Sequence, residues 1–312
     1  MAQDHEKGMV IIVKKLTVNI NSYADAEELV KKSEAEFTAH INKALDEVFD
    51  NDHHRLIALS GPSCSGKTTT ASMLTERITS EGQNAVVMSI DDFFFGRSDR
   101  NKVDIEAPDY DSVKAIDLDY LGEFTKDLLA GKTVRVPKYS FLETARVGYR
   151  EYYPRENDIY IFEGIQAVYP EVTALFGNNY ESVFISVEDD IEYNGTVFTK
   201  HEIRLFRRIV RDYKFRNATA EFTLHLWEGV RANEENNIFP NSQQCDVYIN
   251  SFLPYELFVI APYATDLLRT IPSGSRYRAE AERLMDKLSI FKCDYIEDRM
   301  IPANSVFREF IG

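Results

Sequence analysis

An eight-residue segment, residues 61–68, has the residue types and spacing to bind a chain of phosphate groups. It reads Gly-Pro-Ser-Cys-Ser-Gly-Lys-Thr and fits the pattern G-x-x-x-x-G-K-[ST] of phosphate-binding loops. Glycines at these positions let backbone N–H groups point at phosphate oxygens. We expect Lys67 to reach the β- and γ-phosphates and the hydroxyl of Thr68 to reach Mg²⁺. The other loop residues expected to bind the nucleotide are Gly61, Ser63, Cys64, Ser65, Gly66 and Thr69.

Both flanks of this loop fit the same interpretation. Residues 55–60 form an apolar run that predicts a short buried strand, and the spacing of apolar residues predicts a helix over 67–80. A helix that starts at the loop directs its positive end at a bound anion. The alternative, an accidental glycine-rich turn with this pattern, is expected in roughly one per cent of chains of this length. The sequence therefore predicts a nucleoside-triphosphate site.

Two aspartates follow the next predicted strand, residues 84–90. We expect this strand to lie beside the strand that enters the loop, so that a carboxylate at its carboxyl end meets the γ-phosphate. Asp91 is our candidate for the catalytic residue that orients an acceptor hydroxyl and accepts its proton. Asp92 has an alternative role, because adjacent aspartates often cap the following turn.

A third carboxylate ends the predicted strand at 158–162, in the sequence Glu163-Gly164. At the carboxyl edge of a sheet, Glu163 could hold Mg²⁺ directly or through water. The alternative is an acidic residue that only ends the strand in a turn. The candidate metal ligands are therefore Thr68, Asp91 and Glu163.

Residues 200–216 hold seven Lys or Arg residues against two acidic ones, a local net charge of +5. Four arginines recur at helical spacing, which places four like charges on one helix face; they are Arg204, Arg207, Arg208 and Arg211. The ordinary explanation of such a face is contact with solvent.

A lid over the triphosphate is the alternative for part of this segment, around residues 205–220. Arginines on a lid can neutralise the charge that develops during phosphoryl transfer and exclude water. We expect this role for Arg208, Arg211 and Arg216 but not for Arg204 or Arg207, with Arg211 in the catalytic group.

Predicted strands and helices alternate along the chain, which indicates an α/β fold with a mostly parallel sheet covered by helices on both faces. We expect three parts: residues 1–50 as an N-terminal extension that is mainly one helix, 51–250 as the core with the lid, and 251–312 as a helical C-terminal extension packed on the core. The sequence Asn-Lys-Val-Asp at 101–104 matches a guanine-reading motif, but it precedes any acidic Mg²⁺ motif, and we interpret it as coincidence.

Composition excludes several classes of protein. The net charge of −15 argues against a general nucleic-acid-binding surface. No apolar run is long enough to span a bilayer, and the N-terminal residues lack the apolar segment of a signal peptide. Three separated cysteines predict neither a metal site nor a disulfide framework. We therefore expect a cytoplasmic protein with a small-molecule substrate and no membrane or nucleic-acid partner; homo-oligomerisation stays open.

Across roughly residues 55–250, the chain resembles the uridine kinase and phosphoribulokinase superfamily of P-loop kinases, in its bacterial-type branch. The matching motifs occur in the same order as in uridine kinases. They are G-P-S-C-S-G-K-T-T, S-I-D-D-F-F, I-E-A-P-D-Y-D, G-K-T-V-R-V-P-K-Y-S-F-L-E-T-A-R, I-F-E-G-I and R-R-I-V-R-D.

The resemblance implies a P-loop NTPase fold, ATP and Mg²⁺ as cofactors, and specific site residues. Asp91 would be the catalytic base, with Glu163 and Thr68 at Mg²⁺. The lid arginines would contact phosphate and substrate, and the residues implied at the nucleoside are Glu106 at the ribose hydroxyls, Tyr139 and Phe141 at the base, and Arg146 and Arg208 nearby.

Three positions depart from the uridine kinase pattern. Thr144 occupies the position of a histidine that reads the pyrimidine edge, Ser140 that of an aspartate, and Ala218 that of a second lid arginine. A shorter hydroxyl leaves more room, so purine nucleosides enter the expected substrate range. The function implied is transfer of the γ-phosphoryl group of ATP to the 5′-hydroxyl of a ribonucleoside. The alternatives are a kinase of another hydroxyl metabolite, such as a sugar phosphate or pantothenate, and a non-catalytic ATP-binding regulatory protein.

Overall fold

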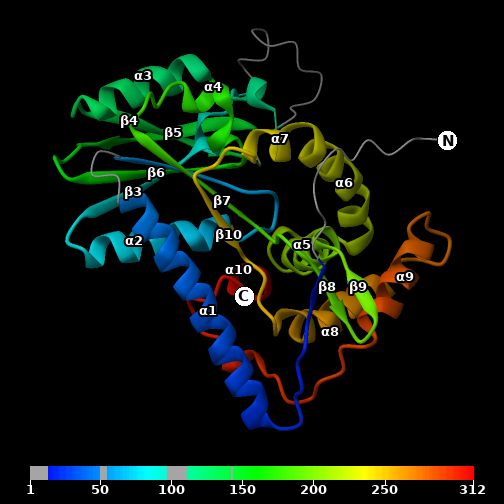
Figure 1. Cartoon of the computed structure of the whole chain (residues 1–312). Helices are drawn as coiled ribbons and strands as arrows, with labels where there is room; N and C mark the ends of the chain where they lie inside the picture. The colour runs from blue at the N-terminus through cyan, green and yellow to red at the C-terminus, as the bar shows by residue number, and fades with distance from the viewer. Residues whose placement is uncertain (1–12, 50–54, 97–109, 111, 142) are drawn as a thin grey trace.

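Five parallel strands form the central sheet of the computed structural model, which describes residues 13–49, 55–96, 110, 112–141 and 143–312 (Figure 1). The strand order is β10-β7-β2-β6-β3. The strands are β2 (Leu56–Ser60), β3 (Asn84–Ser89), β6 (Asp158–Glu163), β7 (Tyr180–Ser186) and β10 (Val247–Asn250). All neighbouring pairs run parallel, as the alternation of strand and helix signals predicts.

The strand next to β2 differs from the expectation. β6 lies between β2 and β3, with Glu163 in register with Leu59 on one side and Ser89 on the other. The prediction that the strand ending before Asp91 lies beside the loop strand is therefore wrong. The order of strands in a sheet is set by how the connecting helices pack, which the local residue pattern does not encode.

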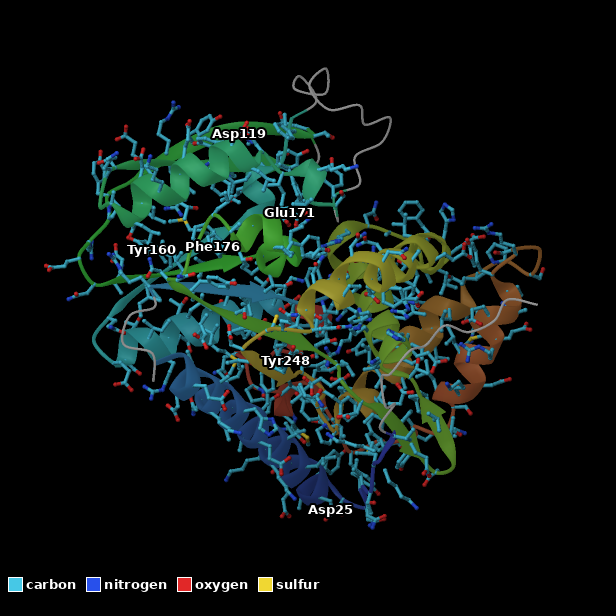
Figure 2. The ribbon with its side chains drawn as sticks, turned by 45° about the horizontal axis from the view of Figure 1, so that its top comes forward. Asp25, Asp119, Tyr160, Glu171, Phe176 and Tyr248 are labelled. Atoms are coloured by element: carbon cyan, nitrogen blue, oxygen red, sulfur yellow. The ribbon has the colours of Figure 1, made fainter. Side chains whose placement is uncertain are left out.

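Side chains alternate between the two faces of the sheet, as the pleat requires. Ile57 and Leu59 of β2 pack into the core on the side of α1 and α2, while Leu56 and Ala58 point to the other side. That second side contains Tyr160 and, from the loop after α4, Phe176 (Figure 2). Both faces are therefore buried, which explains why β2 is apolar from Leu56 to Leu59.

Helices cover both faces of the sheet (Figure 1). α1 (Tyr23–Phe49) and α2 (Lys67–Ser80) lie on one side, and α3 (Leu118–Leu129) and α4 (Pro170–Thr173) on the other. α1 packs on β10 and α2. An antiparallel hairpin of β4 (Val134–Ser140) and β5 (Ala145–Tyr152) contacts α3 and the 3-10 turn η1 (Ile90–Phe93).

A second group of helices packs around α5. Helix α5 (Lys200–Arg216) packs against α6 (Ala220–Asn233), α8 (Glu256–Arg269) and the C-terminal α10 (Arg308–Ile311). The remaining elements of this part are η5 (Glu234–Ile238), α7 (Phe239–Ser242), α9 (Arg278–Leu288) and η6 (Asp298–Met300), and those beside the sheet are η3 (Val113–Ala115) and η4 (Ile165–Val168).

A small second sheet of β1 (Val13–Lys15), β8 (Asp190–Tyr193) and β9 (Thr196–Phe198) was not expected. The segment Asn-Lys-Val-Asp at 101–104 lies outside the described residues. Within the part of the chain that is described, the helices are too short or too polar to cross a bilayer.

Candidate active site

The loop between β2 and α2 requires glycine at two positions. A Cβ atom on Gly61 would lie 2.1 Å from the carbonyl oxygen of Ile185, and one on Gly66 would lie 2.3 Å from Cγ2 of Val306. Gly66 also has a φ of 97°, a conformation that favours glycine. Cys64 adopts a φ of 60° without that freedom, so its backbone is held in an uncommon conformation by its surroundings.

Polar groups of the loop converge at the start of α2. Lys67 Nζ donates to the carbonyl oxygens of Gly61 and Pro62, at 2.9 and 3.2 Å. Ser65 Oγ is buried without a hydrogen-bond partner among the described residues. The first N–H groups of α2 have no intrahelical acceptor, and the exposed side chain of Thr68 lies beside them. This donor set fits the oxygens of a polyphosphate.

The carboxylates predicted from the sequence lie at the same edge of the sheet. Glu163 ends β6, and Asp91 lies two residues beyond β3, in η1. Burial raises the pKa of Glu163, and the nearby charge of Lys67 opposes that effect. The described residues contain no group of three metal-ligating side chains. Mg²⁺ does not need such a group, because it commonly binds one or two carboxylates together with substrate phosphates and water. Glu163 and Thr68 fit that pattern.

Asp92 contacts the hairpin rather than the turn that follows it. Its Oδ1 accepts a hydrogen bond from the backbone N–H of Tyr139, at 2.8 Å. Burial raises the pKa of Asp92, and the hydrogen bond from Tyr139 partly offsets this. The carboxylate therefore fixes β4 against the end of β3, close to Asp91.

One aspartate organises the arginines expected at the lid. Asp212, which is buried, pairs with Arg208 (Nε to Oδ2, 3.2 Å), Arg211 (Nη2 to Oδ1, 2.6 Å) and Arg216 (Nε to Oδ1, 3.7 Å). Arg208 Nη1 also donates to Ser63 Oγ, at 3.1 Å. Asp212 is not among the site residues predicted from the sequence, although this residue ends the motif R-R-I-V-R-D.

Helix α5 is packed along most of its length. Residues 202–212 are buried and 213–216 are exposed, and the helix contacts α8 and α10. Asn217, with a φ of 52°, ends the helix before α6. Arg204 and Arg207 are fully buried. The ordinary explanation of the basic face, contact with solvent, is therefore wrong for these two arginines, because buried carboxylates neutralise them.

Four aromatic rings gather where the hairpin meets η1. The centroid of Phe141 lies 5.3 Å from those of Tyr110 and Tyr139 and 6.0 Å from that of Phe94. The hydroxyls of Tyr110 and Tyr139 are 3.2 Å apart. Tyr139 is 8% exposed, whereas Phe141 is 54% exposed. The cluster thus presents the ring of Phe141 to solvent on a rigid support.

The other predicted substrate residues have different surroundings. Thr144 has a φ of 52°, and its hydroxyl donates to the carbonyl of Phe141 at 3.4 Å, so it belongs to the turn of the hairpin. Arg146 pairs with Asp117 at 3.0 Å and donates to the carbonyl of Phe93 at 2.9 Å, which attaches β5 to the start of α3. Glu106 lies outside the described residues.

The C-terminal region contributes residues that the sequence did not indicate. Glu309 in α10 lies 3.4 Å from the hydroxyl of Thr69 in the first turn of α2. Val306 packs on Gly66, as its close approach to that glycine shows. No local sequence signal could have revealed these contacts, since about 240 positions separate the partners.

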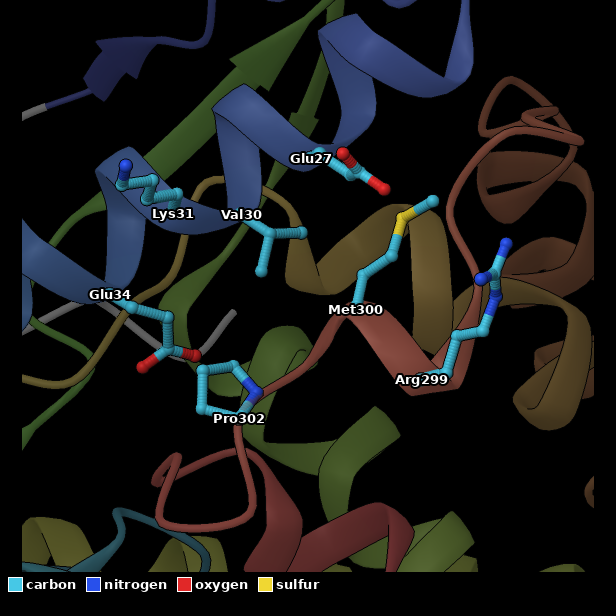
Figure 3. Close-up of a pocket in the computed structure, with 7 residues that line it drawn as sticks. All are labelled: Glu27, Val30, Lys31, Glu34, Arg299, Met300 and Pro302. Atoms are coloured by element: carbon cyan, nitrogen blue, oxygen red, sulfur yellow. The ribbon is translucent and has the colours of Figure 1, made fainter.

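A surface pocket lies elsewhere, between α1 and the segment around η6 (Figure 3). Its lining side chains are Glu27, Val30, Lys31, Glu34, Arg299, Met300 and Pro302. The pocket shares no residue with the P-loop, the strand ends or α5, and its lining carries both signs of charge. It therefore takes no part in the candidate active site.

Comparisons with known proteins find similar sequences among uridine kinases. The chain is 25% identical to uridine-cytidine kinase B of Dictyostelium discoideum over 202 residues, which cover 63% of this chain and 74% of that protein. It is 27% identical to a uridine kinase of Ureaplasma urealyticum over 172 residues, 55% of this chain and 75% of that protein. A solved structure of a possible uridine kinase from Bacillus stearothermophilus aligns with a TM-score of 0.45 and 18% identity, covering 69% of this chain and 99% of that one.

Residues 56–256, more than half of the chain, match the phosphoribulokinase / uridine kinase family. This match confirms the resemblance derived from the motifs. The chain belongs to the phosphoribulokinase / uridine kinase family.

Proposed function

We propose that this protein transfers the γ-phosphoryl group of ATP to the 5′-hydroxyl of a ribonucleoside. Family membership supports a kinase of nucleosides or other small metabolites. The observation that carries the nucleoside assignment is the half-exposed ring of Phe141, held by three other aromatic rings beside the strand end that bears Asp91. A flat, supported aromatic surface is suited to stacking a base.

The P-loop supplies the donor site in this proposal. Its backbone N–H groups and the first turn of α2 would hold the triphosphate of ATP, with Lys67 at the β- and γ-phosphates. Mg²⁺ bound through Thr68 and Glu163 would neutralise charge on the transferred group. The nearby arginines add positive charge at the same edge, since Arg208 already contacts Ser63 of the loop. Arg211 and Arg216 extend this charge along α5.

Asp91 is proposed to orient the attacking hydroxyl and accept its proton. Its place just beyond β3 sets it at the sheet edge where Glu163 ends β6, in register with Ser89. The hydrogen bond from Tyr139 to the neighbouring Asp92 fixes the aromatic cluster relative to this carboxylate. A nucleoside stacked on Phe141 would therefore have its ribose close to Asp91.

The base range is proposed to be broad. The hydroxyl of Thr144 is used within the hairpin turn, which leaves it less suited than a free side chain to reading the edge of a base. Stacking tolerates any base, because every base has a π-face. We further propose that residues 51–250 form the kinase core and that Arg146 fixes the hairpin. We also propose that the protein acts in the cytoplasm, on a small molecule rather than on nucleic acid.

The test is ADP release from Mg·ATP with a panel of acceptors: uridine, cytidine, inosine, guanosine, adenosine, pantothenate and ribulose 5-phosphate. We expect turnover with one or more nucleosides and its loss in Asp91→Asn. A response only to a non-nucleoside would contradict the role of Phe141 and favour a kinase of another metabolite. ATP binding without turnover of any acceptor would favour a regulatory protein.

A further inference from the structure

Two fully buried arginines lie beneath the P-loop and donate hydrogen bonds to its backbone. Arg204 Nη1 donates to the carbonyl oxygen of Ser63, and Arg207 Nη1 donates to that of Cys64, both at 3.2 Å. Both arginines come from α5, and their two acceptors are consecutive residues of the loop. The two hydrogen bonds therefore hold two adjacent peptide units of the loop from the side of the protein interior.

Each guanidinium is held in place by a carboxylate from another element. Glu234 in η5 accepts from both Nη atoms of Arg204, with Nη2 to Oε2 at 2.8 Å. Glu256 in α8 accepts from Nε and Nη2 of Arg207, at 3.2 and 2.6 Å. The backbone carbonyl of Ser251 also accepts from Arg207, at 2.8 Å.

The two hydrogen bonds to each carboxylate fix the directions in which the other N–H groups of that arginine point. The guanidinium is planar and rigid, so a bidentate carboxylate on one edge determines where the other N–H groups point. In both arginines Nη1 also bonds a carbonyl of the P-loop. The other contacts are those of Arg204 Nη2 with His201 Nδ1 and of Arg207 with Ser251. A lysine at either position could neutralise the carboxylate. Its single ammonium group cannot reproduce both the two hydrogen bonds to the carboxylate and the hydrogen bond to the loop carbonyl.

Fixing a carbonyl also fixes the N–H group of the next residue. The peptide unit is planar and trans, so its N–H points away from its C=O. Holding the carbonyls of Ser63 and Cys64 toward the interior therefore turns the N–H groups of Cys64 and Ser65 toward the inside of the loop. In this structure the N–H of Ser65 donates to the carbonyl oxygen of Pro62 across the loop, at 3.3 Å.

The same contacts explain the uncommon backbone of Cys64. A non-glycine residue at φ 60° costs on the order of 1 kcal/mol or more and persists where its surroundings determine it. Arg207 bonds the carbonyl of this residue from a position that is itself fixed by two hydrogen bonds to Glu256.

We propose that Arg204 and Arg207 are positioning residues for nucleotide binding, which act through the P-loop backbone and do not touch the nucleotide. This inference rests on the proposed ATP site. It assigns a functional consequence to two arginines that the residue pattern alone gave no role. A purely structural role would change the stability of the fold and leave the affinity of the folded protein for nucleotide unchanged.

The experiment compares Arg204→Lys and Arg207→Lys with the wild type. Binding of Mg·ADP and Mg·ATP is measured by calorimetry under conditions where thermal melting shows each protein to be folded. We expect a loss of nucleotide affinity of about tenfold or more, because misdirected N–H groups no longer match the phosphates. The KM of the acceptor should stay within about twofold, since the hairpin is untouched.

Lys287→Met is the matched control. Lys287 of α9 pairs with Glu202, which is also on α5. Among the described residues, the carboxylate of Glu202 bonds Thr199, Arg283 and Lys287 rather than the P-loop. This variant should lower the melting temperature and leave nucleotide affinity unchanged. Should Arg207→Lys fail to fold, the double variant Arg207→Met/Glu256→Leu replaces the whole buried ion pair by apolar side chains. Proteins often tolerate this exchange. The double variant should show the same loss of affinity.

Nucleotide affinity within about twofold of the wild type in the folded variants would overturn the inference, whatever their stability. Failure of the wild type itself to bind ATP or ADP would overturn the proposed function and this inference with it. The two failures are therefore distinct.

Discussion

The carboxylate of Glu309 lies 3.4 Å from the hydroxyl of Thr69, so α10 places a negative charge at the first turn of α2. The N-terminus of a helix attracts anions, and the triphosphate would use the same field. Burial raises the pKa of Glu163, and the charge of Glu309 adds to that effect. Glu309 is therefore close enough to influence the charge of the whole site.

Replacing Glu309 by Gln should lower the KM of ATP about fivefold. The substitution keeps the shape of the side chain and removes a repulsion of about 1 kcal/mol between like charges a few ångströms apart. Steady-state kinetics with varied ATP measures the effect, and the exposed Glu171→Gln serves as the control. A rise in KM would instead indicate that the carboxylate contacts the nucleotide favourably.

Lys67→Ala should reduce turnover at least about a hundredfold while the protein folds normally, because removing a major electrostatic donor costs about 3–4 kcal/mol of barrier. Among the described residues, the hydrogen bonds of this side chain go to carbonyls of its own loop, so the variant should still fold. Turnover and thermal melting are measured side by side, with the exposed Lys132→Ala as a charge-matched control. Near-normal turnover in folded Lys67→Ala would rule out its role at the phosphates.

Phe141→Ala should raise the KM of the nucleoside about ten- to a hundredfold, because base–aromatic stacking contributes about 1–3 kcal/mol. The KM of ATP should not change. Tyr153, 64% exposed just after β5, provides a matched control, since it lies outside the aromatic cluster. If Phe141→Ala and Tyr153→Ala behave alike, the ring of Phe141 does not bind the base.

His201 should make stability depend on pH. Burial, with the neighbouring charge of Arg204, lowers the pKa of His201 to about 2. Below the ordinary value of about 6.5 the unfolded chain therefore binds a proton that the folded protein does not, and stability falls as the pH drops. Between pH 7 and pH 5 the loss should be about 2 kcal/mol.

Urea unfolding of wild type and His201→Gln at both pH values measures this contribution. The glutamine can still accept the hydrogen bond that His201 Nδ1 shares with Arg204 at 3.0 Å, but it cannot titrate. The variant should lose less stability than the wild type on acidification. Parallel curves for the two proteins would show that His201 does not titrate on unfolding.

Phe310→Ala should destabilise the protein by about 3–5 kcal/mol, the usual cost of removing a large buried aromatic side chain. Phe310 is fully buried, packs on Phe307, and its ring lies 4.8 Å from the guanidinium of Arg207. The free energy of unfolding in urea tests this expectation. A loss below about 1 kcal/mol would mean that α10 is not an integral part of the core.

Much of this protein is determined by short-range patterns. The P-loop and the strand and helix on either side of it follow from eight residues and the periodicity around them, and α1 follows from its helical spacing. Asp91 and Glu163 reach the same sheet edge because parallel strands end there. These features depend on backbone geometry and on contacts between close neighbours in sequence, which local residue patterns record.

Contacts between segments that are far apart in the sequence could be identified only from the tertiary structure. Local sequence did not show that β6 lies between β2 and β3, or that Glu309 meets Thr69. The basic helix illustrates the reason most clearly. Whether Arg204 and Arg207 face solvent or lie buried depends on Glu234 and Glu256, carboxylates 30 and 49 positions away. A charge can be buried only where a partner compensates its desolvation, and the fold alone decides which partners meet.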